Sequence, residues 1–187
     1  MSNEPRLMTV LHGHGSNGGV AGSLAARIDP KRRFQHVTPN GPVGLGPASF
    51  AWFDGETASG LAQAAVGLAD IVTSSVLVGW SQGGAAALAT VAVAGAPPID
   101  ALVLVSGFLI DAPGVDYDLS VLRGIPVLVQ HGRQDEVVPV FFAEDLAQSL
   151  IDAGALVDLK LYDDVGHLLA SDADDDALSW LTELAER

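Results

Sequence analysis

The sequence lacks cysteine altogether, which excludes disulfide bonds, thiolate metal sites and a cysteine nucleophile. It also lacks long apolar runs: stretches such as Ala101–Ile110 fall well short of the roughly 20 residues that cross a bilayer. Residues Met1–Arg6 contain no cationic stretch followed by an apolar one, so the sequence predicts no signal peptide. We therefore expect a soluble, cytoplasmic protein without stable membrane insertion.

Positive charge is scarce. Nine basic residues, only two of them lysine, stand against 23 acidic ones, and the formal net charge is −14. Such a chain repels the phosphates of nucleic acids, so no nucleic-acid partner is expected. The one dense basic cluster, Lys31–Arg33, follows a predicted helix and is typical of solvated surface. We interpret the excess of aspartate as a hypothesis about a salt-rich cytoplasm, and the sequence leaves the oligomeric state open.

Internal repeats, low-complexity linkers and breaks in composition are absent too, and 187 residues fit one domain spanning residues 1–187. Short β-branched runs alternate with segments of helical periodicity. The β-branched runs are almost continuously apolar, which is typical of parallel strands covered on both faces. The six expected strands are Leu7–Leu11, Gln35–Pro39, Ser75–Trp80, Ala101–Ser106, Ile125–His131 and Leu156–Tyr162.

Helical periodicity is clearest in residues 61–72 and 142–150, where apolar residues recur every three or four positions. Gly154 stands where the second of these helices would be capped. Asp174–Asp176 precede leucines at the same spacing, and we interpret them as a helix start, where the helix dipole favours carboxylates, rather than as a metal site.

The alternation of strands and helices predicts an α/β fold with an open, mostly parallel sheet and helices on both faces. Such sheets bind their ligands at the carboxyl ends of the strands, so polar residues that follow strands are the candidates for chemistry. Residues Asn40–Gly60, rich in glycine and proline, show no clear periodicity. A segment of this length is typical of a binding loop or lid.

The segment Gly79–Gly83 matches the pattern G-x-S-x-G around Ser81. It follows an apolar strand and opens an alanine-rich, helix-compatible run. A sharp turn at this point needs glycines because the serine takes a strained conformation with close neighbours, and the turn would expose the Ser81 hydroxyl. The pattern alone is weak, and a buried junction of small residues without chemistry is the alternative.

A serine hydroxyl becomes a useful nucleophile only beside an oriented base. The sequence supplies Asp135 after the fifth expected strand and His167 after the sixth, in the order serine, aspartate, histidine that is typical of α/β-hydrolases. We predict that these two residues join Ser81. The remaining candidates are interpreted as solvated turn residues (Glu136, Asp163 and Asp164) or as structural histidines (His36 and His131).

A glycine-rich segment follows the first expected strand, and Gly13, Gly15 and Gly18 match the dinucleotide-binding pattern G-x-G-x-x-G. That function expects a carboxylate near the end of the second strand, where Val37–Asn40 contain none. A hydrolase instead uses such a loop to supply a backbone N–H to an oxyanion. We favour the oxyanion loop, with the dinucleotide-binding domain as the alternative.

With these residues in place, the sequence resembles the phospholipase/carboxylesterase family of α/β-hydrolases, which includes acyl-protein thioesterase-like enzymes. The resemblance runs in order from Val10 to His167. The matching segments are Leu11–Gly15, Pro39–Pro42, Trp52–Asp54, Gly79–Gly84, Ser106-Gly107, His131–Pro139 and Gly166-His167.

The resemblance implies a serine hydrolase that cleaves carboxylic esters or thioesters with Ser81 as nucleophile, Asp135 as acid and His167 as base. It also implies oxyanion donors at the backbone N–H groups of His14 and Gln82, no metal and no organic cofactor. Small-molecule or lipid-like acyl esters are the expected substrates. The choice between ester and thioester and the length of the acyl chain stay open. A non-catalytic binding protein of the same fold stays open as an alternative function.

Two features depart from the family pattern. Ser16 stands where aspartate is common after the oxyanion glycine, and the chain begins almost at the oxyanion strand. We therefore expect a compact α/β-hydrolase fold with about six strands and little lid. Within the long loop, Trp52 and Phe53 are the predicted substrate-binding residues.

Overall fold

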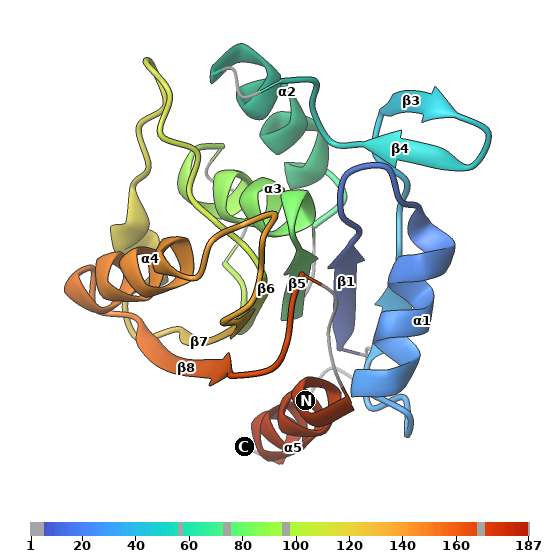
Figure 1. The fold of residues 1–187 in the computed structure, drawn as a ribbon, viewed down its shortest axis with the longest axis vertical. Coiled ribbons are helices and arrows are strands. Elements are labelled where there is room, and N and C mark those ends of the chain that lie inside the picture. The colour runs from blue at the N-terminus through green and yellow to red at the C-terminus, as the bar shows by residue number, and fades with distance from the viewer. Residues whose placement is uncertain (1–5, 56–57, 73–75, 95–97, 168–170, 187) are drawn as a thin grey trace.

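The computed structural model describes residues 6–55, 58–72, 76–94, 98–167 and 171–186. Six strands form one sheet in the order β2-β1-β5-β6-β7-β8, and every neighbouring pair is parallel (Figure 1). The strands are β1 (Leu7–Leu11), β2 (Gln35–Val37), β5 (Val76–Trp80), β6 (Ala101–Val105), β7 (Pro126–Gly132) and β8 (Leu156–Tyr162). All six expected strands are confirmed to within two residues at each end; Ser75 lies outside the described residues.

Helices cover both faces of this sheet. Helices α1 (Gly18–Ile28) and α5 (Ser171–Ala185) pack on one face, and α2 (Ala58–Ala69), α3 (Gln82–Ala92) and α4 (Phe141–Asp152) pack on the other. Side chains alternate along each strand: Val76 and Val78 pack toward α1, whereas Leu77 packs toward α3. Apolar residues are therefore needed at nearly every strand position, which explains the continuous apolar runs in the sequence.

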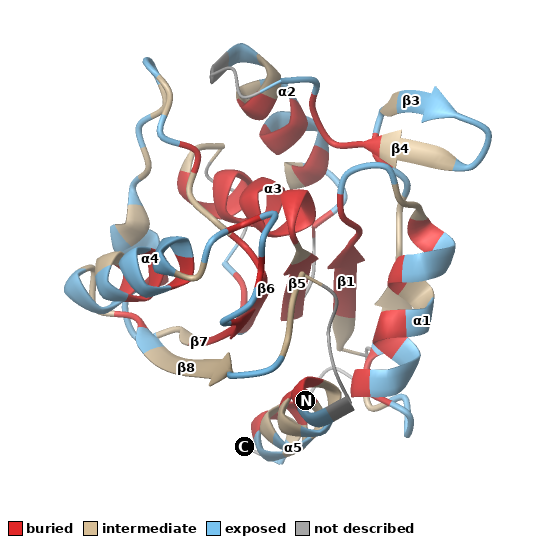
Figure 2. Cartoon of the chain, viewed as in Figure 1, coloured by how far each residue is buried: buried red, intermediate tan, exposed pale blue. Residues whose placement is uncertain are grey.

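Helix α3 lies deepest in the molecule, and all of its residues are buried (Figure 2). Alanine and glycine dominate its sequence, so the helix can lie close to the sheet and beneath α2 without large side chains between them. This close packing matters for function because α3 begins directly after Ser81. The position of the helix therefore determines the position of that serine.

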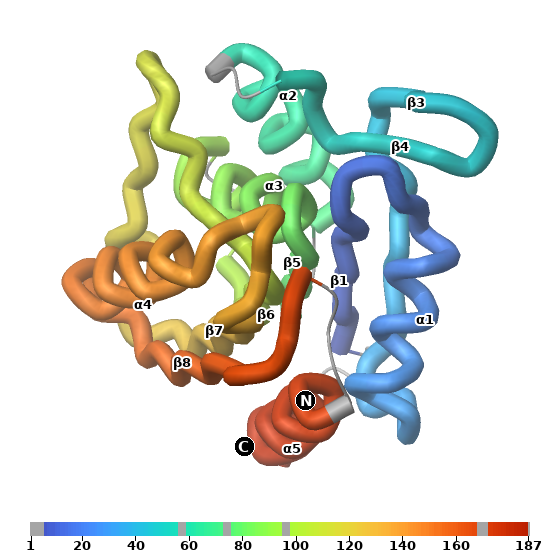
Figure 3. Tube along the Cα trace, viewed as in Figure 1, coloured from blue at the N-terminus to red at the C-terminus, as the bar shows by residue number. Residues whose placement is uncertain are grey.

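The segment 40–60 departs from the expectation of an irregular loop. It contains a small antiparallel hairpin, β3 (Val43–Gly46) and β4 (Ser49–Ala51). The hairpin is joined to the loop after β1, since Gly15 N–H donates to Phe50 O at 2.9 Å and Phe50 N–H donates to Ser16 O at 2.8 Å (Figure 3). Strands of three and four residues that include glycine carry too little alternation to be recognised in sequence.

The helix ends agree with the local sequence signals. Gly154 follows α4 with φ +92°, a conformation that favours glycine. Helix α5 begins at Ser171, so Asp174 lies in its first turn, where its carboxylate also binds Arg27 of α1 at 2.6 Å. The interpretation as a helix start is confirmed for Asp174, whereas Asp175 and Asp176 lie beyond the first turn because the helix begins earlier than expected. Among the described residues, no group of three or more histidine, aspartate and glutamate side chains could hold a metal ion.

Within the described ranges, no helix combines enough length and apolar character to cross a membrane.

Candidate active site

The turn between β5 and α3 holds Ser81 in the left-handed region, with φ +54° and ψ −121°. The glycines around it are sterically required. A Cβ atom at Gly79 would lie 2.4 Å from Gly83 O, and one at Gly83 would lie 2.3 Å from Leu11 O. The strained serine and the crowded glycines predicted from the G-x-S-x-G pattern are therefore present in the structure.

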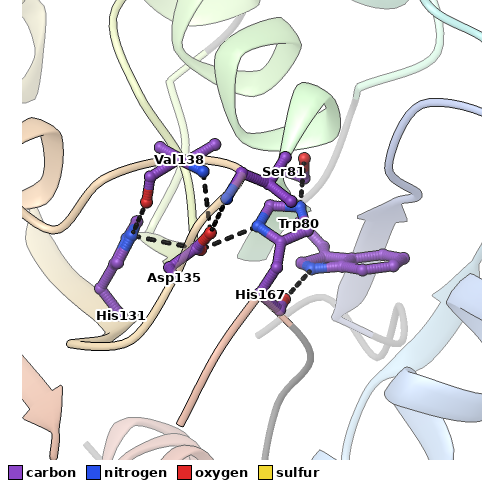
Figure 4. Close-up of polar contacts among 7 residues, drawn as sticks. Trp80, Ser81, His131, Asp135, Val138 and His167 are labelled. Carbon is purple, nitrogen blue, oxygen red and sulfur yellow. Dashed lines mark hydrogen bonds and ion pairs between the residues drawn. The ribbon is translucent and has the colours of Figure 1, made fainter.

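The structure brings Ser81, Asp135 and His167 together at the carboxyl edge of the sheet (Figure 4). His167 Nε2 lies 2.9 Å from Ser81 Oγ, and His167 Nδ1 lies 2.8 Å from Asp135 Oδ2. A carboxylate at Nδ1 keeps the imidazole proton on that nitrogen, which leaves Nε2 free to accept the serine proton. The three side chains thus form one continuous chain of polar contacts, in which Asp135 orients the imidazole toward Ser81.

The Asp135 carboxylate is buried and held by several donors. Its Oδ1 atom accepts hydrogen bonds from the N–H groups of Val137 at 2.9 Å and Val138 at 2.8 Å. Burial, the largest single influence, raises the pKa of Asp135. The hydrogen bonds from Val138, His167 and Val137, together with the charge of His167, outweigh it and leave the pKa below its ordinary value. The group is therefore an anion at neutral pH.

The loops that carry Asp135 and His167 pack directly on each other. A Cβ atom at Gly132 would lie 2.1 Å from Val165 O, and Gln134 N–H donates to that same oxygen at 3.0 Å. The remaining candidates behave as the sequence predicted. Glu136, Asp163 and Asp164 are exposed, and His36 lies in β2 beside Asp29.

Trp80 and His131, which the sequence analysis did not assign to the site, support His167 and Asp135 respectively. The indole of Trp80 donates to His167 O at 3.3 Å, and the two rings lie 5.9 Å apart (Figure 4). Val138 receives a hydrogen bond on its carbonyl from the fully buried His131, at 2.7 Å. His131 thus has the structural position that was expected of it, directly behind the carboxylate.

The loop after β1 places His14 at the Ser81 cavity, and Gln82 reaches the same cavity from the start of α3. Among the described residues, neither backbone N–H donates a hydrogen bond. Two N–H groups without a partner at residues that line one cavity are the kind of donor that a developing oxyanion would need.

His12 anchors this loop, a role that the sequence analysis missed. Its Nε2 accepts a hydrogen bond from Gly41 N–H at 3.0 Å, so its proton resides on Nδ1, which donates to Gly13 O at 2.8 Å. Burial lowers the pKa of His12, although the bond to Gly13 opposes that shift. The ring is therefore neutral and joins the loop after β1 to the loop after β2.

The Gln82 side chain makes two further contacts. Its Oε1 accepts from Trp52 N–H and its Nε2 donates to Phe53 O, both at 2.9 Å. The Trp52 indole donates to His12 O at 2.7 Å. The glutamine after the serine therefore ties the segment 52–53 to the turn, a connection between residues about 30 positions apart that no local pattern reveals.

A cavity of about 610 Å³ opens beside Ser81. Phe53 lines it although only 3% of the residue is exposed. Trp52 does not reach this cavity: it is 2% exposed and lines a neighbouring cavity of about 570 Å³ that shares Phe53. The sequence analysis missed the other apolar walls, Phe108–Ile110, Val137 and Phe142. The rule that sites follow strand ends would have found the first of these, which come directly after β6.

The dinucleotide-binding alternative fits this loop poorly. The first N–H groups of α1, which a phosphate would need, are already bonded within the chain. Gly18 N–H donates to Asn40 Oδ1 at 2.7 Å, and Val20 N–H donates to Asn17 Oδ1 at 3.1 Å.

Comparison with known proteins identifies the fold. A family model described as phospholipase/carboxylesterase matches residues 63–184. The crystal structure of esterase PE8 is 29% identical, with a TM-score of 0.77 over 96% of this chain and 93% of that chain. Acyl-protein thioesterase 2 of Zea mays is 23% identical, with a TM-score of 0.78 over 98% and 95% of the two chains.

The carboxylesterase of Bacillus cereus is 20% identical, with a TM-score of 0.80 over 98% of this chain and 90% of that chain. No curated protein matches the chain significantly. The α/β-hydrolase fold expected from the sequence is confirmed.

Proposed function

Because the chain belongs to the phospholipase/carboxylesterase family and is a carboxylic ester hydrolase, we propose that it cleaves esters or thioesters through an acyl-enzyme on Ser81. The observation that carries the proposal is the continuous contact from Ser81 Oγ through His167 to Asp135, at 2.9 and 2.8 Å. A hydroxyl, an imidazole and a carboxylate in this order form the arrangement that activates serine nucleophiles.

Acylation begins when His167 Nε2 takes the proton of Ser81 Oγ while that oxygen attacks the substrate carbonyl. The imidazolium that forms is stabilised by the Asp135 carboxylate at Nδ1. Negative charge develops on the carbonyl oxygen, which accepts hydrogen bonds from the N–H groups of His14 and Gln82. His167 then protonates the departing alkoxide or thiolate, and the acyl group stays on Ser81.

Deacylation reverses these roles. A water molecule in the place of the leaving group gives its proton to His167 Nε2 and attacks the acyl carbon, and the collapse of the second oxyanion returns the proton to Ser81. Apart from the substrate and this water molecule, the steps described use groups of this chain. The hydrogen bonds that Asp135 accepts support both halves, because they keep the carboxylate ionised and fixed while the imidazole gains and loses a proton.

The test compares Ser81→Ala with wild type in the hydrolysis of p-nitrophenyl butyrate and in labelling by a fluorophosphonate. We expect Ser81→Ala to lose both while its circular dichroism spectrum stays that of wild type. Ser23→Ala is the matched control, since that serine lies exposed on α1 and its hydroxyl donates within the helix, to Gly19 O. Labelling that persists in Ser81→Ala, or a wild-type protein that neither reacts nor turns over, would refute the proposal.

A further inference from the structure

The cavity beside Ser81 carries charge of one sign. Among the described residues that line it, Asp111 is the one aspartate or glutamate, and no lysine or arginine is present. Asp111 is exposed and forms no ion pair with any residue in the described ranges. A negative charge in this position, on a chain of net charge −14, attracts cations and repels carboxylates and phosphates.

Aromatic rings surround the same space. Phe53, Phe108 and Phe142 line the cavity, and the rings of Phe108 and Phe142 meet edge to face with centroids 6.5 Å apart. The face of an aromatic ring carries partial negative charge and attracts a cation, most strongly one that is weakly hydrated. Quaternary ammonium groups have this property, because their methyl groups leave no N–H for water to bind.

We propose that this cavity selects esters that carry a quaternary ammonium group, which Asp111 and the phenylalanine rings hold while the ester carbonyl lies at Ser81. The proposal rests on the proposed hydrolysis at Ser81 and adds the substrate class. The apolar part of the lining agrees with it, since the side chains of Leu109, Ile110 and Val137 offer contacts to methyl groups. A neutral apolar ester of the same shape would contact the same residues but would not be attracted by Asp111. Comparing the two esters therefore measures the contribution of the positive charge.

The experiment measures kcat/KM for butyrylcholine and for 3,3-dimethylbutyl butyrate, which has the same shape with carbon in place of the charged nitrogen. We expect wild type to prefer the cation by about fivefold at low ionic strength, and the preference to shrink as salt screens the charge. Asp111→Asn lowers this ratio toward one, and Asp111→Lys brings it below one. Phe142→Leu, which keeps an apolar side chain but removes the ring, also lowers the ratio.

The matched control is Asp70→Asn, which removes one exposed negative charge from a residue that does not line the cavity. Asp70→Asn should keep the wild-type ratio of the two kcat/KM values, because it changes the net charge of the chain without changing the charge at the cavity. Equal rates for the two esters in wild type, or the same ratio in wild type and Asp111→Asn, would overturn the cation site. Hydrolysis of p-nitrophenyl butyrate would still support the acyl-enzyme in that case, and its loss would refute the proposed function instead.

Discussion

His131 Nε2 lies 3.3 Å from Asp135 Oδ2, the oxygen that also accepts the hydrogen bond from His167. Two imidazoles therefore share one carboxylate oxygen, one from the strand β7 and one from the loop after β8. The His131 ring is fully buried and its Nδ1 atom has no partner among the described residues. The ring thus acts as a fixed support: its Nε2 atom contacts both Val138 O and the Asp135 carboxylate.

We expect His131→Phe to reduce both stability and kcat. The change leaves Val138 O without its donor in a buried position, and such a loss costs about 1–3 kcal/mol. The loop that carries Asp135 then loses its fixed geometry, so kcat for p-nitrophenyl butyrate should fall more than KM rises. Urea unfolding and steady-state kinetics measure the two effects. A variant with wild-type stability and kcat would show that His131 does not support the loop.

Acid should destabilise the protein in part through His12. Burial lowers its pKa from the ordinary 6.5, so the unfolded chain binds a proton that the folded chain excludes, and the stabilising contribution is lost as the pH falls below that value. Asp135 adds to the loss at lower pH, since its pKa is also lowered and its contribution disappears below about 3.8.

The measurement for His12 is the free energy of unfolding in urea between pH 7.5 and 5. Wild type should lose stability relative to His12→Asn over this range, because asparagine does not titrate. The difference isolates His12 from the other acidic and basic groups that both proteins share. A difference that stays constant, or that grows in favour of wild type toward pH 5, would contradict the expected sign.

Two glycine-to-alanine changes should have opposite effects. Gly83→Ala places a methyl group 2.3 Å from Leu11 O, between two backbones that cannot yield, and should cost about 3 kcal/mol or more. Gly67→Ala lies in α2, where no described residue outside the neighbouring helical backbone comes within 4 Å of the new Cβ, and should stabilise the protein by about 1 kcal/mol. Thermal unfolding distinguishes the two. Equal destabilisation by both would mean that the turn around Ser81 is not sterically crowded.

Salt should stabilise the folded protein. The formal net charge of −14 makes the compact state repel itself, and salt reduces that repulsion over the distances that separate surface carboxylates. We expect the unfolding temperature to rise steadily from 0.05 to 2 M KCl. The same temperature throughout would remove the hypothesis that the acidic composition reflects a salt-rich habitat.

Much of the fold could be predicted because its signals are local. Continuous apolar runs located six strands, and Gly154 marked the end of α4. The hairpin β3–β4 could not be predicted, because its short strands gain their stability from Gly15 and Ser16, which are distant in sequence. Trp52 shows the same limitation. Its position in a long loop suggested contact with substrate, yet its indole donates a hydrogen bond to His12 O and it lines the cavity next to the one beside Ser81.

The sequence by itself determined the order of strands and helices and the crowded turn at Ser81, because hydrophobic periodicity and the need for glycine act between close neighbours along the chain. Only the tertiary structure decided that Ser81 and His167, 86 positions apart, lie in hydrogen-bond contact. It alone brought Asp111 and the phenylalanine rings to one cavity. The physical reason is that these contacts depend on which strands lie side by side in the sheet. That order is set when the strands assemble and helices cover both faces of the sheet, and it differs from the order along the chain.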